Sequence, residues 1–113
     1  DGLTDKTATL LLKNMPALQS VDFSGCDLLT DEAVKALPRT LQHVDFSCCK
    51  LLTDEAAKAL PQTLHIVNFS GCDLLTDEAV RVLGAYRNLQ HASFYRCGQI
   101  TEDAKLILPS IKH

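Results

Sequence analysis

Four of the five cysteines recur at a nearly constant interval, and cysteine thiolates can bind metals or act as nucleophiles. They are separated by 23, 23 and 25 residues, at Cys26, Cys49, Cys72 and Cys97. A tetrahedral zinc site needs sulfurs that converge on one point, and the sequence contains no Cys-x-x-Cys pair. Cysteines that occur once per repeat stack in a column and do not converge. We therefore predict no metal site and no cofactor.

A second set of residues with catalytic chemistry occupies alternate positions of one segment, at His43, Asp45 and Ser47. These residue types make up a hydrolytic triad, in which histidine accepts the serine proton and aspartate orients the histidine. Alternate residues of a strand share a face but lie about 6.8 Å apart, so no ordered Ser–His–Asp chain follows. An open sheet also lacks a pocket that excludes water. We therefore predict no catalytic residues and a protein that is not an enzyme.

These residues belong to an internal repeat, and the repeat predicts the elements that position them. Each copy contains a segment such as Val44-Asp45-Phe46 that alternates apolar and polar residues, which is typical of a short strand with one buried face. The phenylalanine of each segment is expected to be buried, at Phe23, Phe46, Phe69 and Phe94. The polar residues of the same strands are expected to lie on the opposite, exposed face.

Each strand segment is followed by threonine, acidic residues, alanine and leucine, which is typical of a short helix. The expected N-caps are Thr30, Thr53 and Thr76. Favourable i,i+4 ion pairs are expected at Asp31–Lys35, Asp54–Lys58 and Asp77–Arg81. The helices are expected to end at Pro38, Pro61, Gly84 and Pro109.

A strand and a helix in about 23 residues cannot bury an apolar face alone, whereas stacked copies can. Strands are spaced more closely than helices, so the stack should curve with its sheet inside. The pattern Leu41-x-x-Val44-x-Phe46-x-x-Cys49-x-x-Leu52-Thr53-Asp54 resembles the cysteine-containing leucine-rich repeat, as found in F-box proteins. The resemblance implies an α/β leucine-rich-repeat solenoid with a curved parallel sheet inside and short helices outside.

The resemblance covers residues 1–113, which we interpret as a single domain of about four repeats plus a partial N-terminal one. The first residue is not an initiator methionine, so we expect a segment of a longer protein. The resemblance also implies that the repeated cysteines turn inward and satisfy backbone groups of the bend. They should form a buried ladder of free thiols. Cys48 takes the place of a glycine found in two other copies. It is expected to be exposed and to point in a different direction from Cys49.

The concave face of the sheet is the candidate binding site, because its side chains are not needed by the core. The adjacent residues Asp22 and Asp45 form a small acidic strip that could receive a lysine or arginine; the alternative is a solvated polar face. Tyr95 and Arg96 are residue types that anchor interfaces, although a divergent terminal repeat would look the same. The candidate partner-binding residues are Asp22, His43, Asp45, Ile66, Asn68, His91, Ser93, Tyr95 and Arg96.

Bulk properties exclude two classes of partner. The net charge of −3 argues against binding to nucleic acid or an anionic membrane. The odd number of cysteines and the lack of a signal-peptide pattern favour an intracellular, cytoplasmic protein. We therefore expect a scaffold for protein–protein interaction. The alternatives are the substrate-recognition part of an F-box-like ubiquitin-ligase adaptor and a structural subunit of a larger complex.

Apolar residues at the two ends of the stack also need cover. The N-terminal segment contains three consecutive leucines and Met15, and the C-terminal one contains Ala104, Leu106, Ile107, Leu108 and Ile111. We expect other chain segments, another subunit or self-association to cover at least one end, either by end-to-end contact or in a larger assembly.

Overall fold

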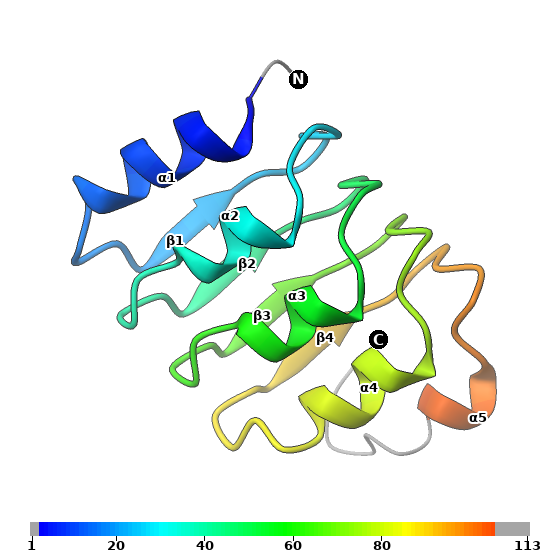
Figure 1. Ribbon diagram of the computed structural model, residues 1–113. Helices are drawn as coiled ribbons and strands as arrows, with labels where there is room; N and C mark the ends of the chain where they lie inside the picture. Colours follow the sequence, from blue (N-terminus) through cyan, green and yellow to red (C-terminus); the bar gives the residue numbers. More distant parts are fainter. Residues whose placement is uncertain (1–2, 106–113) are drawn as a thin grey trace.

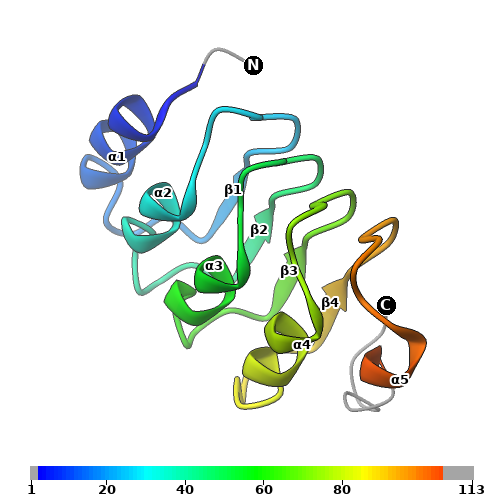
Figure 2. The same cartoon turned by 45° about the vertical axis from the view of Figure 1, so that its right-hand side comes forward.

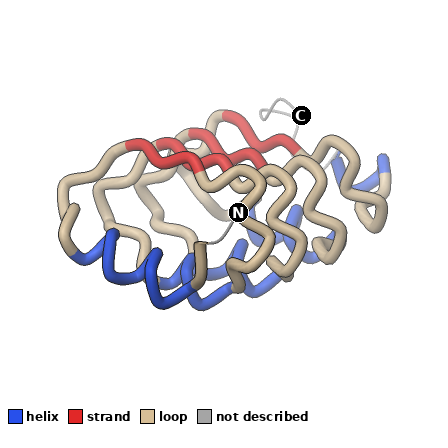
Figure 3. The backbone as a smooth tube through the Cα atoms, turned by 90° about the horizontal axis from the view of Figure 1, so that it is seen from above, coloured by secondary structure: helices blue, strands red, loops and turns tan. Residues whose placement is uncertain are grey.

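Short strands alternate with short helices along residues 3–105, the part of the chain that the computed structural model describes. The order is α1 (Asp5–Lys13), β1 (Ser20–Asp22), α2 (Asp31–Lys35), β2 (His43–Asp45), α3 (Asp54–Ala59), β3 (Ile66–Asn68), α4 (Asp77–Leu83), β4 (His91–Ser93) and α5 (Glu102–Lys105). The strands form one parallel sheet in the order β1-β2-β3-β4, and the helices form a second layer (Figures 1 and 3). The predicted α/β stack of strand–helix units is confirmed.

The strands pair in the register that the repeat predicts. The central, inward-facing residues of the strands align as Val21, Val44, Val67 and Ala92. On the exposed face, one column contains Ser20, His43, Ile66 and His91, and the next contains Asp22, Asp45, Asn68 and Ser93. Residues that lie one repeat apart in the sequence are therefore neighbours in space.

A stack of phenylalanines fills the space between the sheet and the helices. The ring centroids of Phe23, Phe46, Phe69 and Phe94 are 5.9, 5.8 and 6.1 Å apart along the stack, and all four side chains are buried. Burial of each ring stabilises the fold by about 1.5–3 kcal/mol, and ring–ring contact adds about 0.5–1.5 kcal/mol. The prediction that the phenylalanines form the core is confirmed.

Each helix begins after a threonine, and in α1 to α4 the aspartate that follows joins neighbouring repeats. Thr53 Oγ1 accepts a hydrogen bond from the Glu55 N–H, as expected for an N-cap. Asp31 reaches from the previous repeat, where its carboxylate accepts the Thr53 N–H at 2.9 Å and the Thr53 hydroxyl at 2.5 Å. The same two hydrogen bonds recur at Asp5–Thr30, Asp54–Thr76 and Asp77–Thr101. We call these four links the Asp–Thr ladder.

The predicted i,i+4 ion pairs are wrong, because the Asp–Thr ladder engages the aspartates. The basic residues pair instead with glutamates three residues earlier, at Lys35–Glu32, Lys58–Glu55 and Arg81–Glu78. These pairs are solvent-exposed, so each contributes about 0–1 kcal/mol.

The helices end close to the predicted residues. Gly84 follows α4 directly, as predicted. α3 ends one residue before Leu60, which itself precedes Pro61, whereas α2 ends three residues before Pro38. Pro109 and most of the predicted C-terminal apolar cluster lie outside the described residues. No helix within residues 3–105 is long and apolar enough to cross a membrane.

Candidate functional site

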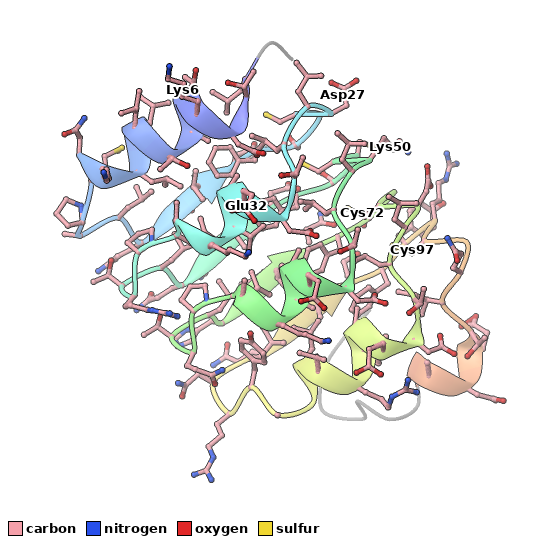
Figure 4. All side chains as sticks on the ribbon, viewed as in Figure 1. Lys6, Asp27, Glu32, Lys50, Cys72 and Cys97 are labelled. Atoms are coloured by element: carbon pink, nitrogen blue, oxygen red, sulfur yellow. The ribbon has the colours of Figure 1, made fainter. Side chains whose placement is uncertain are left out.

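The repeated cysteines form a ladder of buried, hydrogen-bonded thiols. Three of the four thiols donate to the carbonyl oxygen of a phenylalanine in the preceding repeat, at 3.1, 3.2 and 3.0 Å for Cys49–Phe23, Cys72–Phe46 and Cys97–Phe69. Figure 4 shows Cys72 and Cys97 in successive turns beyond the strand ends. The predicted buried ladder is confirmed, and its thiols pair with the previous repeat as well as lining the bend.

Burial makes these thiols poor nucleophiles. It raises the pKa of Cys49 and of Cys72 to about 12 from an ordinary value of 9.0, because the thiolate would lie in an apolar environment. The five cysteines all lie within the described residues, and no disulfide joins them. No group of three or more histidine, cysteine, aspartate or glutamate side chains within residues 3–105 is arranged to hold a metal ion.

The turn after each strand contains one residue in the left-handed region of the backbone. This residue is glycine in two repeats, with φ of 76° and 75° at Gly25 and Gly71, but Cys48 and Arg96 adopt φ of 62° and 60°. The Cys48 N–H donates to the Ser70 carbonyl at 2.7 Å, so this conformation serves the inter-repeat hydrogen bonds. Cys48 is exposed while Cys49 is buried, as predicted. The two non-glycine residues carry a steric cost of about 1–2 kcal/mol each.

The exposed face of the sheet brings the predicted partner-binding residues together on neighbouring strands and turns. We define this sheet face by Ser20, Asp22, Ser24, His43, Asp45, Ser47, Ile66, Asn68, Ser70, His91, Ser93 and Tyr95. Ser24, Ser47, Ser70 and Tyr95 each lie two residues after the last residue of a strand, in the turns, and not in the strands as predicted. Arg96 is adjacent, in the turn after β4.

The aspartates of the sheet face also support the fold, which contradicts the prediction that these positions are unconstrained. One carboxylate oxygen of Asp22 accepts the Ser24 N–H at 2.8 Å, and one of Asp45 accepts the Ser47 N–H at the same distance. Asn68 uses its side-chain oxygen in the same way. Within residues 3–105 the second carboxylate oxygen of Asp22 and of Asp45 accepts no hydrogen bond, so it remains available to a partner.

Hydrogen bonding favours the ionised form of Asp22 in this strip. Hydrogen bonds from the side chain and then the backbone of Ser24 lower the pKa of Asp22. Asp22 pairs with Asp45 across β1 and β2, so two negative charges lie side by side. Like charges about 5 Å apart at a solvent-exposed site repel by about 1 kcal/mol, which a cation from a partner would relieve.

The serine, aspartate and histidine of β2 do not form a triad. Ser47 Oγ donates to Asp45 Oδ1 at 2.5 Å, which is closer than predicted because β2 ends at Asp45 and the chain then turns. In a triad the serine proton goes to histidine, but within the described residues no hydrogen bond joins His43 to either side chain. No pocket is found in the described structure either.

The end of the sheet face at the last repeat carries an exposed aromatic ring. Tyr95 is 65% exposed, and the Arg96 guanidinium carbon lies 5.4 Å from its ring centroid. This cation–π contact orients both side chains at the surface. A rigid tyrosine beside an arginine is a common anchor in protein interfaces. The geometry is compatible with the predicted anchor role.

Tyr86 has a structural role that the sequence did not reveal. Its ring is buried, and its hydroxyl donates to the Ala57 and Leu60 carbonyls at 2.6 and 3.0 Å. These carbonyls lie at the end of α3, the helix of the preceding repeat. The two extra residues of the last repeat thus place a tyrosine that caps α3. The coincidence of an insertion with a tyrosine is the only sequence signal for this contact.

A second surface was missed by the sequence reasoning. Leu28, Leu51 and Leu74 occupy the same position in successive turns between cysteine and helix, and they are 51%, 44% and 44% exposed. Their sequence neighbours Asp27 and Lys50 mark this edge in Figure 4. The core does not require apolar residues at these three positions.

Comparison with known proteins agrees with the geometry. Residues 14–37, 38–60 and 61–84 each match the family described as Leucine Rich repeat. The structure is similar to a chain in the crystal structure of the Rad7 and Elc1 complex in yeast, with a TM-score of 0.84 and 22% sequence identity. The similarity covers 96% of this chain and 29% of that one, so this chain spans less than a third of its neighbour. A search of curated proteins finds no match.

Proposed function

This chain belongs to the leucine-rich repeat family, and from that premise we propose that its sheet face binds a protein partner. The repeats serve as a rigid support on which neighbouring strands present side chains at fixed spacing. The partner contributes a lysine or arginine to the strip formed by Asp22 and Asp45. Tyr95 and Arg96 contact the same partner at the other end of the face.

The observation that carries this proposal is that the two oxygens of each aspartate side chain have different roles. One oxygen of each carboxylate caps a turn, and this hydrogen bond holds the side chain in one orientation. The hydrogen bonds to these carboxylates within the described residues reach Oδ1 and not Oδ2, in side chains that are exposed at Asp22 and half-buried at Asp45. Carboxylates that are oriented in advance lose little conformational freedom on binding, so a cation is bound at a lower entropic cost.

The structure also provides a substitution that separates charge from folding. Asn68 caps its turn with a side-chain amide oxygen at 2.8 Å, as Asp22 and Asp45 do with carboxylates. The double variant Asp22→Asn/Asp45→Asn should therefore retain both turns and lose both charges. Proteins captured by the immobilised variant are compared quantitatively with those captured by the wild type, and melting temperatures are measured in parallel.

We expect at least a tenfold loss of the proteins that the wild type captures, with a melting temperature within about 2 °C of the wild type. The control is Glu32→Gln/Glu55→Gln, which removes the same charge from the helix side, where Figure 4 shows Glu32 on α2. This control should capture the same proteins as the wild type. Equal capture by the wild type and the Asp22→Asn/Asp45→Asn variant would refute the proposed site.

A role in assembly is consistent with the structural neighbour, whose crystal structure is that of a complex of Rad7 with Elc1. An F-box-like adaptor, a structural subunit of a larger complex and a cytoplasmic location stay predictions. Mass spectrometry of the captured proteins addresses the first two, because ubiquitin-ligase subunits would favour the adaptor and a stoichiometric assembly would favour the structural subunit.

A further inference from the structure

The connections that lead from each helix to the next strand form an edge without acidic side chains. Figures 1 and 2 show these connections along one edge of the molecule and the turns that follow the strands along the opposite edge. Within residues 3–105, every aspartate and glutamate lies at a strand end, in one of those opposite turns or in the first turn of a helix. We define the connection edge by the four segments that contain none: residues 13–20, 36–43, 59–66 and 84–91.

One column of side chains on the connection edge joins neighbouring repeats. The hydroxyls of Thr40 and Thr63 donate to backbone carbonyls of the previous repeat at 2.7 and 2.6 Å. Asn88 occupies the same position in the last repeat, where its side-chain amide donates to the Gln62 carbonyl at 3.0 Å. Polar side chains at this position are therefore used by the fold.

The neighbouring column has no such role. Arg39, Gln62 and Arg87 occupy the same position of successive repeats, two residues before the buried leucine. All three side chains are exposed, and none of them forms a hydrogen bond or an ion pair with a described residue. The basic side chains on α2, α3 and α4 differ, because each pairs with a glutamate of its own helix. The two arginines thus carry positive charge that is not neutralised within the described chain.

The stacking of the repeats places these two charges at a fixed separation. Neighbouring strands are about 4.8 Å apart, so the backbone positions of Arg39 and Arg87 lie about 10 Å apart with Gln62 between them. Burial raises the pKa of the Tyr86 hydroxyl, and the charge of Arg39 acts in the opposite direction. The Arg39 side chain is therefore near the residue that directly precedes Arg87. At about one Debye length in 0.1 M salt the two cations repel only weakly, and both can act on one anionic ligand.

We propose that the connection edge binds an acidic segment of a partner protein in the polyproline II conformation, with two carboxylates three residues apart on Arg39 and Arg87. This conformation has three residues per turn and a rise of about 3.1 Å per residue, so side chains at i and i+3 lie on one side about 9 Å apart. Arginine can hold each carboxylate through two parallel N–H bonds. The amide of Gln62 lies between them and can bind the peptide backbone.

The charge distribution favours a short acidic segment over nucleic acid. A nucleic acid is a continuous polyanion whose binding depends on many phosphate contacts. Within the described residues the connection edge offers only Lys13 besides Arg39 and Arg87 as a lysine or arginine. The strands that start here end at acidic residues such as Asp22 and Asp45, which would repel a longer polyanion. The site is separate from those aspartates, so the inference does not depend on the proposed function.

A heptapeptide with regularly spaced carboxylates tests the site. The peptide Glu-Ser-Ser-Glu-Ser-Ser-Glu, with blocked termini, is titrated into the full chain labelled with nitrogen-15, and amide chemical shifts give the responding residues and the dissociation constant. We expect the amides of the connection edge to shift. The Arg39→Gln/Arg87→Gln variant should bind about tenfold more weakly, because two charge-assisted pairs are lost. It should keep the wild-type melting temperature, since Gln62 shows that the position accommodates glutamine.

Three matched controls separate this site from bulk charge. Gln62→Arg should bind the peptide about threefold more tightly, because a third cation joins the column. Lys35→Gln/Lys58→Gln removes the same charge as the arginine variant from the helix side, and should change the affinity by less than about twofold. The peptide Glu-Glu-Glu-Ser-Ser-Ser-Ser has the same composition but adjacent carboxylates, and should bind about threefold more weakly because its carboxylates do not match the spacing of the arginines.

Several results would overturn the proposal. They are equal affinity of the wild type and the Arg39→Gln/Arg87→Gln variant, shifts confined to the opposite edge around Lys50 and Arg96, and no shift at millimolar peptide. Tighter binding of a thymidine tetranucleotide than of the peptide would show that the edge takes nucleic acid and not an acidic protein segment.

Discussion

Removal of one aspartate from the Asp–Thr ladder should destabilise the protein far more than removal of its exposed neighbour. Asp54 is the most informative position, because it lies in an interior repeat and is partly buried. Its carboxylate accepts the Thr76 N–H at 2.8 Å and the Thr76 hydroxyl at 2.5 Å. The matched control is Glu55, the next residue of the same helix, whose carboxylate pairs with the exposed Lys58.

The expected magnitude follows from these contacts. Asp54→Ala removes two hydrogen bonds and leaves the Thr76 N–H without its acceptor, which costs about 2–3 kcal/mol in the free energy of unfolding. For a chain of this size that corresponds to a fall in melting temperature of about 8–12 °C. Glu55→Ala removes one exposed ion pair and should cost less than about 0.5 kcal/mol. Asp77→Ala should cost less than Asp54→Ala, because the ladder partner Thr101 is exposed.

Calorimetry and urea unfolding at pH 7 measure the melting temperature and the free energy of unfolding of the three variants. The expected ranking of destabilisation is Asp54→Ala, then Asp77→Ala, then Glu55→Ala. Equal losses for Asp54→Ala and Glu55→Ala would show that the ladder contributes no more than a surface ion pair. The account of how neighbouring repeats are joined would then be refuted.

Four further predictions concern the turns, the tyrosine cap and the thiols. Cys48→Gly should stabilise the protein by about 1 kcal/mol, because glycine has no steric penalty at φ of 62°. Gly71→Ala should cost more than Gly25→Ala, since only the Cβ at position 71 would meet Cys48 Sγ, at 3.1 Å; urea midpoints that reverse this order would contradict the turn geometry. Tyr86→Phe should cost about 1–3 kcal/mol by removing the donor to two buried carbonyls, and an unchanged melting temperature would exclude that role. Burial raises the pKa of Cys49 and of Cys72 from 9.0 to about 12, so between these pH values the folded state retains protons that the unfolded chain releases. The contribution of the two thiols to the free energy of unfolding should therefore be constant below pH 9 and decrease as the pH rises toward 12. A Cys72→Ser variant, with one buried thiol fewer, should lose stability less steeply between pH 9 and 11, and identical pH profiles would contradict the assignment.

The strands and the core could be predicted from the sequence because their signals are local and repeated. A period of two around Phe46 identifies a strand with one buried face, and the recurrence of this pattern shows that the copies stack. Both of these inferences need only residue type and spacing. The position of the repeated cysteines inside the bend is instead what the resemblance to the leucine-rich repeat implies.

The roles of the polar residues could not be predicted in the same way. On α2, Asp31 is one helical turn from Lys35, and the sequence alone favours that pair over Thr53 in the next repeat. The choice depends on the distance between helices, which local spacing does not contain. Likewise, Asp45 looks unconstrained as a strand residue, and only the turn that follows it shows that its carboxylate supports the backbone.

The stacking of three-residue strands in a single parallel sheet has a mechanical consequence. Bonds between neighbouring repeats run along the stack, so tension applied between its two ends would load the interfaces one after another and not all together. Repeats should then peel off singly, each releasing a contour length of about 80 Å for some 23 residues. Under force such a molecule would unfold stepwise, lengthening in nearly equal increments, and it would refold when the force is removed.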